Sequence, residues 1–128
     1  MSTKIPEELR YAKSHEWIRV EGNVATVGIS DHAQEELTEL VFIELPEIGR
    51  ELEAEEACAV VESVKTASDI YSPLTGKVVD ANDHVSENSG IVNDDPYKDG
   101  WLFKIEFTDP DELESLLTAE QYRDQISG

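Results

Sequence analysis

The sequence predicts a mainly β fold with short helices, some of them at its C-terminal end. Short runs of β-branched and aromatic residues recur along the chain, separated by the Gly, Pro, Asn and Asp residues typical of turns. Helix-capping signals gather after residue 108. With 128 residues, 39% of them hydrophobic, the chain is expected to form one domain over residues 1–128 around a modest core.

The N-terminal part contains a predicted hairpin. Residues 9–20 and 24–29 are rich in β-prone side chains, and Gly22 and Asn23 lie between them. A Gly-Asn pair between two such runs is a typical hairpin turn. We therefore expect two neighbouring antiparallel strands here.

A short helix is predicted after this hairpin. Asp31 and Gln34 have capping-box spacing, with Asp31 as the cap and Gln34 reaching back to it. The helix is expected to end near Leu40, because residues 41–45 are again strand-like. Residues 46–49 then contain the Pro and Gly of a turn.

The most informative hairpin surrounds a single lysine. Residues 58–61 are small and β-branched, and residues 69–72 alternate polar and apolar before Pro73 ends the run. Lys65 lies between them, at or near the tip of the predicted hairpin. A lysine at a tight turn is exposed and geometrically fixed, which suits a residue that another enzyme modifies, although most turn lysines are simply solvated.

The remaining strands follow at intervals. Residues 74–77 predict a turn into a strand at residues 78–81. Residues 82–100 are rich in Asn, Asp, Ser, Gly and Pro, which predicts a long loop with one helical turn around residues 89–92. Residues 101–107 alternate most clearly with a period of two, as expected for a half-buried strand.

Two helices are expected at the C-terminal end. Residues 109–110 form an Asp-Pro pair that suits a cap followed by a proline at the first helical position. Leu113, Leu116 and Leu117 would then share one helical face. A second helix is predicted over residues 118–126, opening with Thr-Ala-Glu-Gln as its cap.

The net charge, the apolar runs and the cysteine content indicate which ligands and which cellular compartment fit the protein. A net charge of −19 and a pI near 4.2 oppose nucleic-acid binding, because phosphates would be repelled. The chain has no membrane-spanning apolar run and no signal-peptide core, so the simplest interpretation is a cytoplasmic protein of a bacterium or archaeon, with a mature mitochondrial form as the alternative. The single cysteine, Cys58, is interpreted as a small buried residue in a reducing compartment.

The sequence contains no arrangement typical of an enzyme active site. His15, His32 and His84 lack metal-ligand spacing, and neither a phosphate-binding glycine loop nor a nucleophile elbow is present. We therefore expect a non-catalytic carrier or binding module without a metal.

Residues 62–73, Glu-Ser-Val-Lys-Thr-Ala-Ser-Asp-Ile-Tyr-Ser-Pro, resemble the lipoylation segment of the glycine cleavage system H protein family. Further similar segments follow the family's order at residues 14–17, 28–34, 41–46, 93–97, 100–101 and 112–117. The resemblance thus spans nearly the whole chain.

This resemblance implies a lipoyl-domain-like barrel-sandwich hybrid, with a lipoyl-binding core at about residues 24–106 and a C-terminal helical segment at about residues 109–127. Lys65 would carry lipoic acid in amide linkage, attached by a lipoate-protein ligase or octanoyltransferase. The protein would then be a monomeric carrier in glycine catabolism. It would take the aminomethyl group from glycine decarboxylase (P protein) to the tetrahydrofolate-dependent aminomethyltransferase (T protein), and dihydrolipoamide dehydrogenase (L protein) would reoxidise it.

The family also suggests roles for residues around the arm. Ser14, Glu16 and Asp69 match positions that could hold the protonated amine of the loaded arm, and His32 would lie near its path. A carboxylate stabilises such a cation by a charge-assisted hydrogen bond. Glu62 and Ser63, which precede the lysine, are candidates for recognition by the ligase.

Two other carrier functions are alternatives to glycine cleavage. An H-like lipoyl donor that passes the cofactor to other enzymes would have the same sequence features, so the sequence does not separate it from glycine cleavage. A biotin carrier is disfavoured, because biotin sites usually place methionine on both sides of the lysine, whereas Val64 and Thr66 flank Lys65.

Overall fold

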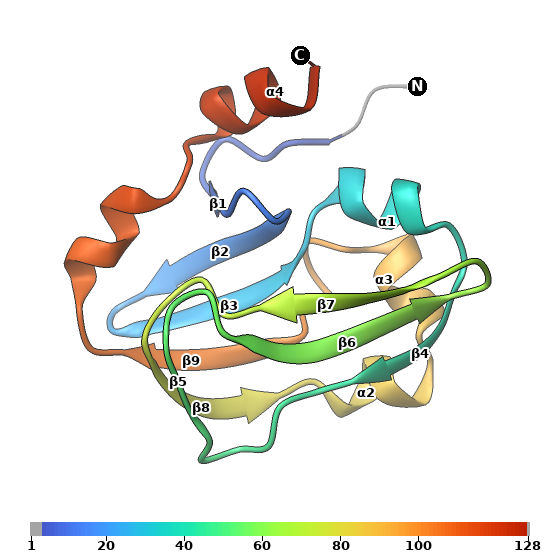
Figure 1. The fold of residues 1–128 in the computed structure, drawn as a ribbon, viewed down its shortest axis with the longest axis horizontal. Helices are drawn as coiled ribbons and strands as arrows, with labels where there is room; N and C mark the ends of the chain where they lie inside the picture. The colour runs from blue at the N-terminus through green and yellow to red at the C-terminus, as the bar shows by residue number, and fades with distance from the viewer. Residues whose placement is uncertain (1–3, 128) are drawn as a thin grey trace.

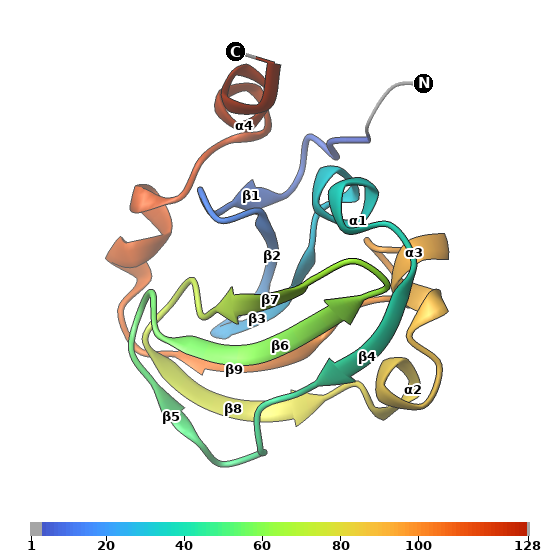
Figure 2. The same cartoon turned by 45° about the vertical axis from the view of Figure 1, so that its right-hand side comes forward.

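The computed structural model describes residues 4–127, which form two β-sheets packed face to face (Figures 1 and 2). Residues 1–3 and 128, which the expected domain also includes, lie outside the described residues. The predicted mainly β class with a C-terminal helix is confirmed. No helix within residues 4–127 has the length and apolar character needed to span a membrane.

The larger sheet has six strands in the order β1-β2-β3-β9-β8-β5, and every neighbouring pair is antiparallel. Its strands are β1 (Arg10–Tyr11), β2 (Glu16–Glu21), β3 (Val24–Ile29), β5 (Glu51–Leu52), β8 (Gly76–Ala81) and β9 (Phe103–Phe107). The smaller sheet has the order β4-β6-β7, with β4 (Leu40–Glu44), β6 (Ala57–Ser63) and β7 (Ala67–Tyr71). The predicted hairpins at Gly22-Asn23 and around Lys65 are therefore both present.

Helices lie at the edges of the sheets. They are α1 (Asp31–Leu37), α2 (Asp83–Glu87), α3 (Gly90–Asp94), the 3-10 helix η1 (Pro110–Ser115) and α4 (Ala119–Ser127). Asp109 caps η1 with Pro110 in its first turn, as predicted. Thr118 and Gln121 exchange the two hydrogen bonds of a capping box at the start of α4, also as predicted.

The main core lies between the two sheets. Ile43 and Val61 are cross-strand partners in the smaller sheet, and both are buried. Val78 and Ile105 are partners in the larger sheet and are also buried. Because side chains alternate between the faces of a strand, each sheet contributes one apolar face to this core.

A second, aromatic cluster fastens the C-terminal helix to the N-terminal strand. The rings of Tyr11 and Tyr122 stack with their centroids 4.6 Å apart. Tyr11 and Leu117 also exchange backbone hydrogen bonds of 2.9 and 2.7 Å. Figure 1 shows α4 lying beside the β1 segment, so the two ends of the described chain meet.

The predicted cap of α1 is wrong by one residue. Ser30, not Asp31, is the N-cap, and its hydroxyl accepts a hydrogen bond of 3.1 Å from the backbone N–H of Ala33. Asp31 instead accepts a 2.8 Å bond from the side-chain amide of Gln34. Serine and aspartate are comparable caps, so adjacent candidates are not distinguished by type.

The boundaries of two further predictions also change. The helix expected to end near Leu40 ends at Leu37, because Thr38 has a φ of 67° and Leu40 already begins β4. The long loop predicted at residues 82–100 contains two short helices, α2 and α3, instead of a single turn. Asn82 caps α2 through its side chain. Asparagine is common both in turns and at helix N-caps, so its residue type did not predict this helix.

The three C-terminal leucines do not share one helical face. Leu113 and Leu116 pack against the main core, three residues apart as the 3-10 period requires. Leu117 lies beyond the helix, forms a β-bridge with Tyr11 and packs against the aromatic cluster. The segment thus connects both clusters.

Gly28 allows the closest approach in the aromatic region. It is the cross-strand partner of Trp17, and a Cβ at this position would lie 2.6 Å from Cε2 of the indole. The indole is fully buried, and its N–H donates a 2.9 Å hydrogen bond to the carbonyl of Pro96. It therefore has little room to move aside.

We expect Gly28→Ala to lower the free energy of unfolding by about 1–3 kcal/mol, because the added methyl group forces the indole out of its packed position. Urea denaturation monitored by tryptophan fluorescence would measure the change. Gly90→Ala is the matched control, since its Cβ would meet no atom closer than 3.5 Å. Equal stabilities for the two variants would contradict this account of the Trp17 packing.

Candidate functional site

The loop between β6 and β7 places Lys65 at an exposed hairpin tip. Within residues 4–127, the Lys65 side chain has neither a hydrogen bond nor a salt bridge to another residue. Its Nζ is therefore accessible from solvent.

The backbone beneath Lys65 is held by Ser63. The hydroxyl of Ser63 lies 3.3 Å from the Lys65 backbone N and 3.2 Å from that of Thr66, and it accepts from both N–H groups. The Ser63 backbone N–H donates to the Thr66 carbonyl at 2.7 Å, which closes the turn. The Val64 N–H also donates to the Glu39 carbonyl at 3.0 Å, so the tip is attached to the chain that enters β4. Ser63 is thus part of the turn's own structure.

The two acidic candidates near Lys65 point outward from the smaller sheet. Glu62 is half-buried on β6 and Asp69 is exposed on β7. Their cross-strand partners are Phe42 for Glu62 and Val60 for Asp69, on rows that alternate with the buried Ile43–Val61 row. Neither carboxylate reaches the cavity described next.

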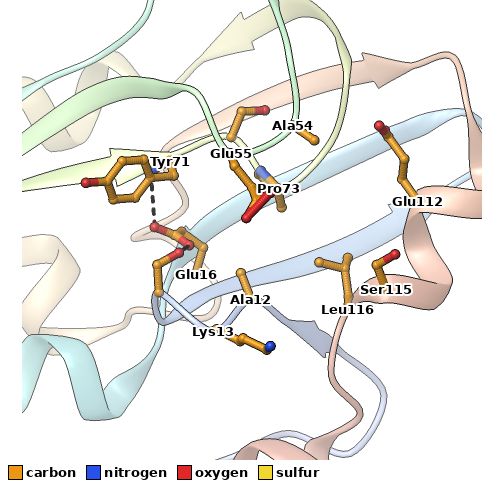
Figure 3. A pocket seen from close by; sticks show the side chains of 12 residues that line it. Ala12, Lys13, Glu16, Ala54, Glu55, Tyr71, Pro73, Glu112, Ser115 and Leu116 are labelled. Atoms are coloured by element: carbon orange, nitrogen blue, oxygen red, sulfur yellow. Dashed lines mark hydrogen bonds between the residues drawn. The ribbon is translucent and has the colours of Figure 1, made fainter.

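A cavity of about 590 Å³ opens at the opposite end of β7 (Figure 3). Its charged and polar lining includes Ser14, Glu16, Glu55 and Glu112, together with one basic residue, Lys13. Apolar wall is contributed by Ala12, Pro73 and Leu116, among others. Acidic groups on a partly apolar wall suit a ligand that combines a cation with a hydrocarbon body.

Glu16 is the most unusual group in this cavity, because its side chain is fully buried. Its Oε1 accepts a short hydrogen bond from the Ser14 hydroxyl, and its Oε2 accepts a 3.1 Å bond from the backbone N–H of Tyr71 (Figure 3). Burial raises the pKa of Glu16 above its usual range, and the bonds from Ser14 and Tyr71 oppose this only in part. A cation in the cavity would favour the ionised form.

His32 lies on α1 and belongs to a different cluster. Its ring centroid is 5.1 Å from that of His15, and its Nε2 is 3.8 Å from a carboxylate oxygen of Glu36. Burial and the neighbouring His32 lower the pKa of His15, so His15 tends to remain neutral. His32 therefore lies in the cluster with His15, and it does not line the cavity that contains Glu16.

Sequence reasoning missed the role of His15. Its Nδ1 lies 2.8 Å from the Tyr122 hydroxyl, which lies 2.6 Å from the Ser30 hydroxyl. These two hydrogen bonds join the β1–β2 loop to α4 and to the start of α1. The Ser-His-Glu-Trp segment resembles the family, but Tyr122 is 107 residues from His15 and no local pattern links the two.

The interpretation of Cys58 as a small buried residue is confirmed. Cys58 is buried, and its burial raises the pKa of the thiol to about 12, so it behaves as an inert core residue. Within residues 4–127, no group of three or more His, Cys, Asp or Glu side chains is arranged to hold a metal ion.

The raised pKa of Glu16 predicts a pH-dependent effect of Glu16→Gln. In the wild type, the stability associated with the protonated carboxyl is complete below the unfolded pKa of 4.5 and is lost as pH rises through the higher folded pKa. The glutamine does not titrate and retains an acceptor for Tyr71. Relative to the wild type, E16Q should therefore become more stable as pH rises through this window, by about 1.4 kcal/mol per unit of pKa displacement.

Urea denaturation of both proteins between pH 4 and pH 8 would test this. Glu114→Gln removes the same charge from an exposed position of η1 and serves as the control. A stability difference between E16Q and wild type that falls with rising pH would contradict the assigned direction.

Comparison with known proteins agrees with this architecture. The sequence model of the family described as "Glycine cleavage H-protein" matches residues 9–128. The glycine cleavage system H protein of Alcanivorax borkumensis is 56% identical over 124 residues, covering 97% of each chain. The protein of the same name from Alkalilimnicola ehrlichii is 51% identical over 126 residues, covering 98% of this chain and 97% of the relative.

A solved structure shares the fold. The crystal structure of a glycine cleavage system H protein from Mycobacterium marinum superimposes with a TM-score of 0.86 at 35% sequence identity. The match covers 97% of this chain and 100% of the other. Both the family model and the relatives extend over nearly the whole sequence, so the chain belongs to the glycine cleavage H-protein family.

Proposed function

We propose that this protein is the lipoyl carrier of a glycine cleavage system and that Lys65 is its attachment site. The observation that carries the proposal is the accessible Lys65 side chain on a turn whose backbone is held by Ser63 and Glu39. A rigid base and a free Nζ are what a modifying enzyme and a mobile arm both require. Membership of the H-protein family supports the glycine cleavage system as the pathway in which the carrier would act.

The residues at the tip fit a covalent lipoyl group. Nζ of Lys65, after losing a proton, would attack the carbonyl carbon of an activated acyl donor, either an acyl adenylate or an acyl thioester. An amide bond forms, and the adenylate or thiolate leaves with the bonding electron pair. The lysine loses its positive charge in this step, and within residues 4–127 no salt bridge of its side chain has to break.

The bound lipoyl group would supply a redox-active disulfide that carries the aminomethyl group from the P protein to the T protein and is restored by the L protein. The chain's own contribution is tethering, which replaces free encounters with a high local concentration. The isolated protein would therefore not catalyse the reaction, and the fixed hairpin would define where the arm begins.

Strand β7 would guide an arm from Lys65 towards the cavity. Asp69 lies along this strand, and the backbone N–H of Tyr71 at its end binds Glu16. Five residues of extended chain span about 17 Å, so the cavity is one strand length from the tip. At the far end, Ser14 and Glu16 would accept hydrogen bonds from, or pair with, a protonated amine. His32 on α1 would line the route.

We expect the unmodified protein to gain the mass of one lipoyl group when treated with a lipoate-protein ligase, lipoate and ATP, and Lys65→Arg to gain none. Arginine retains the positive charge, but its guanidinium is not acylated under these conditions. Intact-mass spectrometry followed by peptide fragmentation would measure the addition and locate it.

Lys77→Arg is the matched control, since Lys77 is an exposed lysine on β8. It should be lipoylated like the wild type. In a reconstituted system of P, T and L proteins, lipoylated wild type and K77R should support glycine cleavage, whereas K65R should not. Full lipoylation of K65R would disprove the attachment site, and failure of the lipoylated wild type to support cleavage would disprove the carrier role.

A further inference from the structure

Strand β4 contains a bulge that turns two neighbouring apolar side chains outward. Leu40 pairs with Ser63 and Phe42 pairs with Glu62, so Val41 is the extra residue on the bulged strand. Leu40 and Ile43 are buried, whereas Val41 and Phe42 are 53% and 49% exposed. A regular strand would alternate and could not expose two successive residues in this way, so the exposure is a consequence of the bulge.

Phe42 lies on β4, the edge strand of the β4-β6-β7 sheet, and carboxylates follow it across the outward side of this sheet, here called the outer face. Glu62 is its direct cross-strand partner. Glu44 lies two residues further along β4, in a row with Val60 and Asp69. In Figure 1 no other element of the described chain lies in front of β6 and β7. The outer face thus has an aromatic side chain at its β4 edge and carboxylates beside it on β4, β6 and β7.

The hairpin tip continues this surface. Val64 is 63% exposed and directly precedes Lys65. Its N–H donates to the carbonyl of Glu39, which brings the tip beside the start of β4. Single exposed apolar residues need no explanation, but Val41, Phe42 and Val64 form a group next to one lysine. An exposed aromatic and apolar group with charged residues beside it is typical of a protein–protein interface.

We propose that the outer face, with Phe42 as its anchor, is the docking surface for the enzyme that acylates Lys65. This inference rests on the proposed function. The enzyme that acylates Nζ must reach the base of the arm, whereas enzymes that act on the far end of the arm need not touch the tip. Charge complementarity fixes the chemistry of its surface: an apolar pocket for Phe42, bordered by Lys and Arg side chains that face Glu44, Glu62 and Asp69.

The test measures kcat/KM for lipoylation of the unmodified protein by a lipoate-protein ligase with lipoate and ATP. Phe42→Ala should lower kcat/KM at least about tenfold, mainly through a higher KM, as expected for loss of an interface anchor. Phe42→Leu should retain most of the rate, because it keeps an apolar side chain. Glu44→Gln combined with Glu62→Gln should weaken the dependence of kcat/KM on salt concentration.

Val79→Ala is the matched control. Val79 is the unpaired residue at the β8 bulge of the larger sheet and is 38% exposed, so it is an outward apolar residue at a bulge away from Lys65. It should be lipoylated at the wild-type rate. Thermal unfolding and the rate of Lys65 labelling by a small amine-reactive reagent should be the same in F42A and wild type, which would show that the tip itself is intact.

Each outcome distinguishes the two proposals. If wild type is lipoylated at Lys65 and F42A has the same kcat/KM as V79A, the docking surface is wrong and the carrier role stands. If F42A loses only its activity with the P protein, the outer face belongs to that enzyme and the present assignment is overturned. If wild type takes up no lipoyl group, the attachment site fails and the docking surface fails with it.

Discussion

The buried carboxylate of Glu16 is the polar constraint on which the functional end of the molecule depends. It begins β2 in the larger sheet and accepts a hydrogen bond from Tyr71, the last residue of β7 in the smaller sheet. A carboxylate without partners would be costly in this position, so its oxygens are satisfied by Ser14 and by the Tyr71 backbone. The same group then forms part of the cavity wall. Joining the sheets and lining the cavity are thus properties of one side chain.

Much of the fold follows from local patterns in the sequence. Both hairpins were predictable because a turn signal separated two β-prone runs, and the α4 capping box because its two members are only three residues apart. The errors arose where local signals compete. Ser30 and Asp31 are equally good caps, and only the position of the helix within the fold selects Ser30. Residues 82–100 have loop-like composition, yet Asn82 and the buried Val85 and Val92 organise them into short helices against the core.

The residues of the candidate site also differ in how well the sequence predicts them. Exposure of Lys65 at a tip was predictable from its flanking strands, whereas burial of Glu16 was not, since a glutamate next to a turn is usually solvated. The contact between Glu16 and Tyr71 joins residues 55 positions apart. The bulge in β4 was equally hidden, because Val41 and Phe42 read as ordinary members of a strand, and only the register with β6 reveals that both face outward.

Strand β7 connects the two ends of the proposed arm path. The exposed Lys65 tip lies at one end of the strand, and the buried Glu16 carboxyl group lies at the other. Alternation along the strand places Asp69 on the outer face and Ile70 in the core. A substitution on the outer face is therefore expected to leave the packing that positions Glu16 undisturbed. This separation follows from the period-two geometry of the strand, and it allows the proposed docking surface and the proposed arm cavity to change independently.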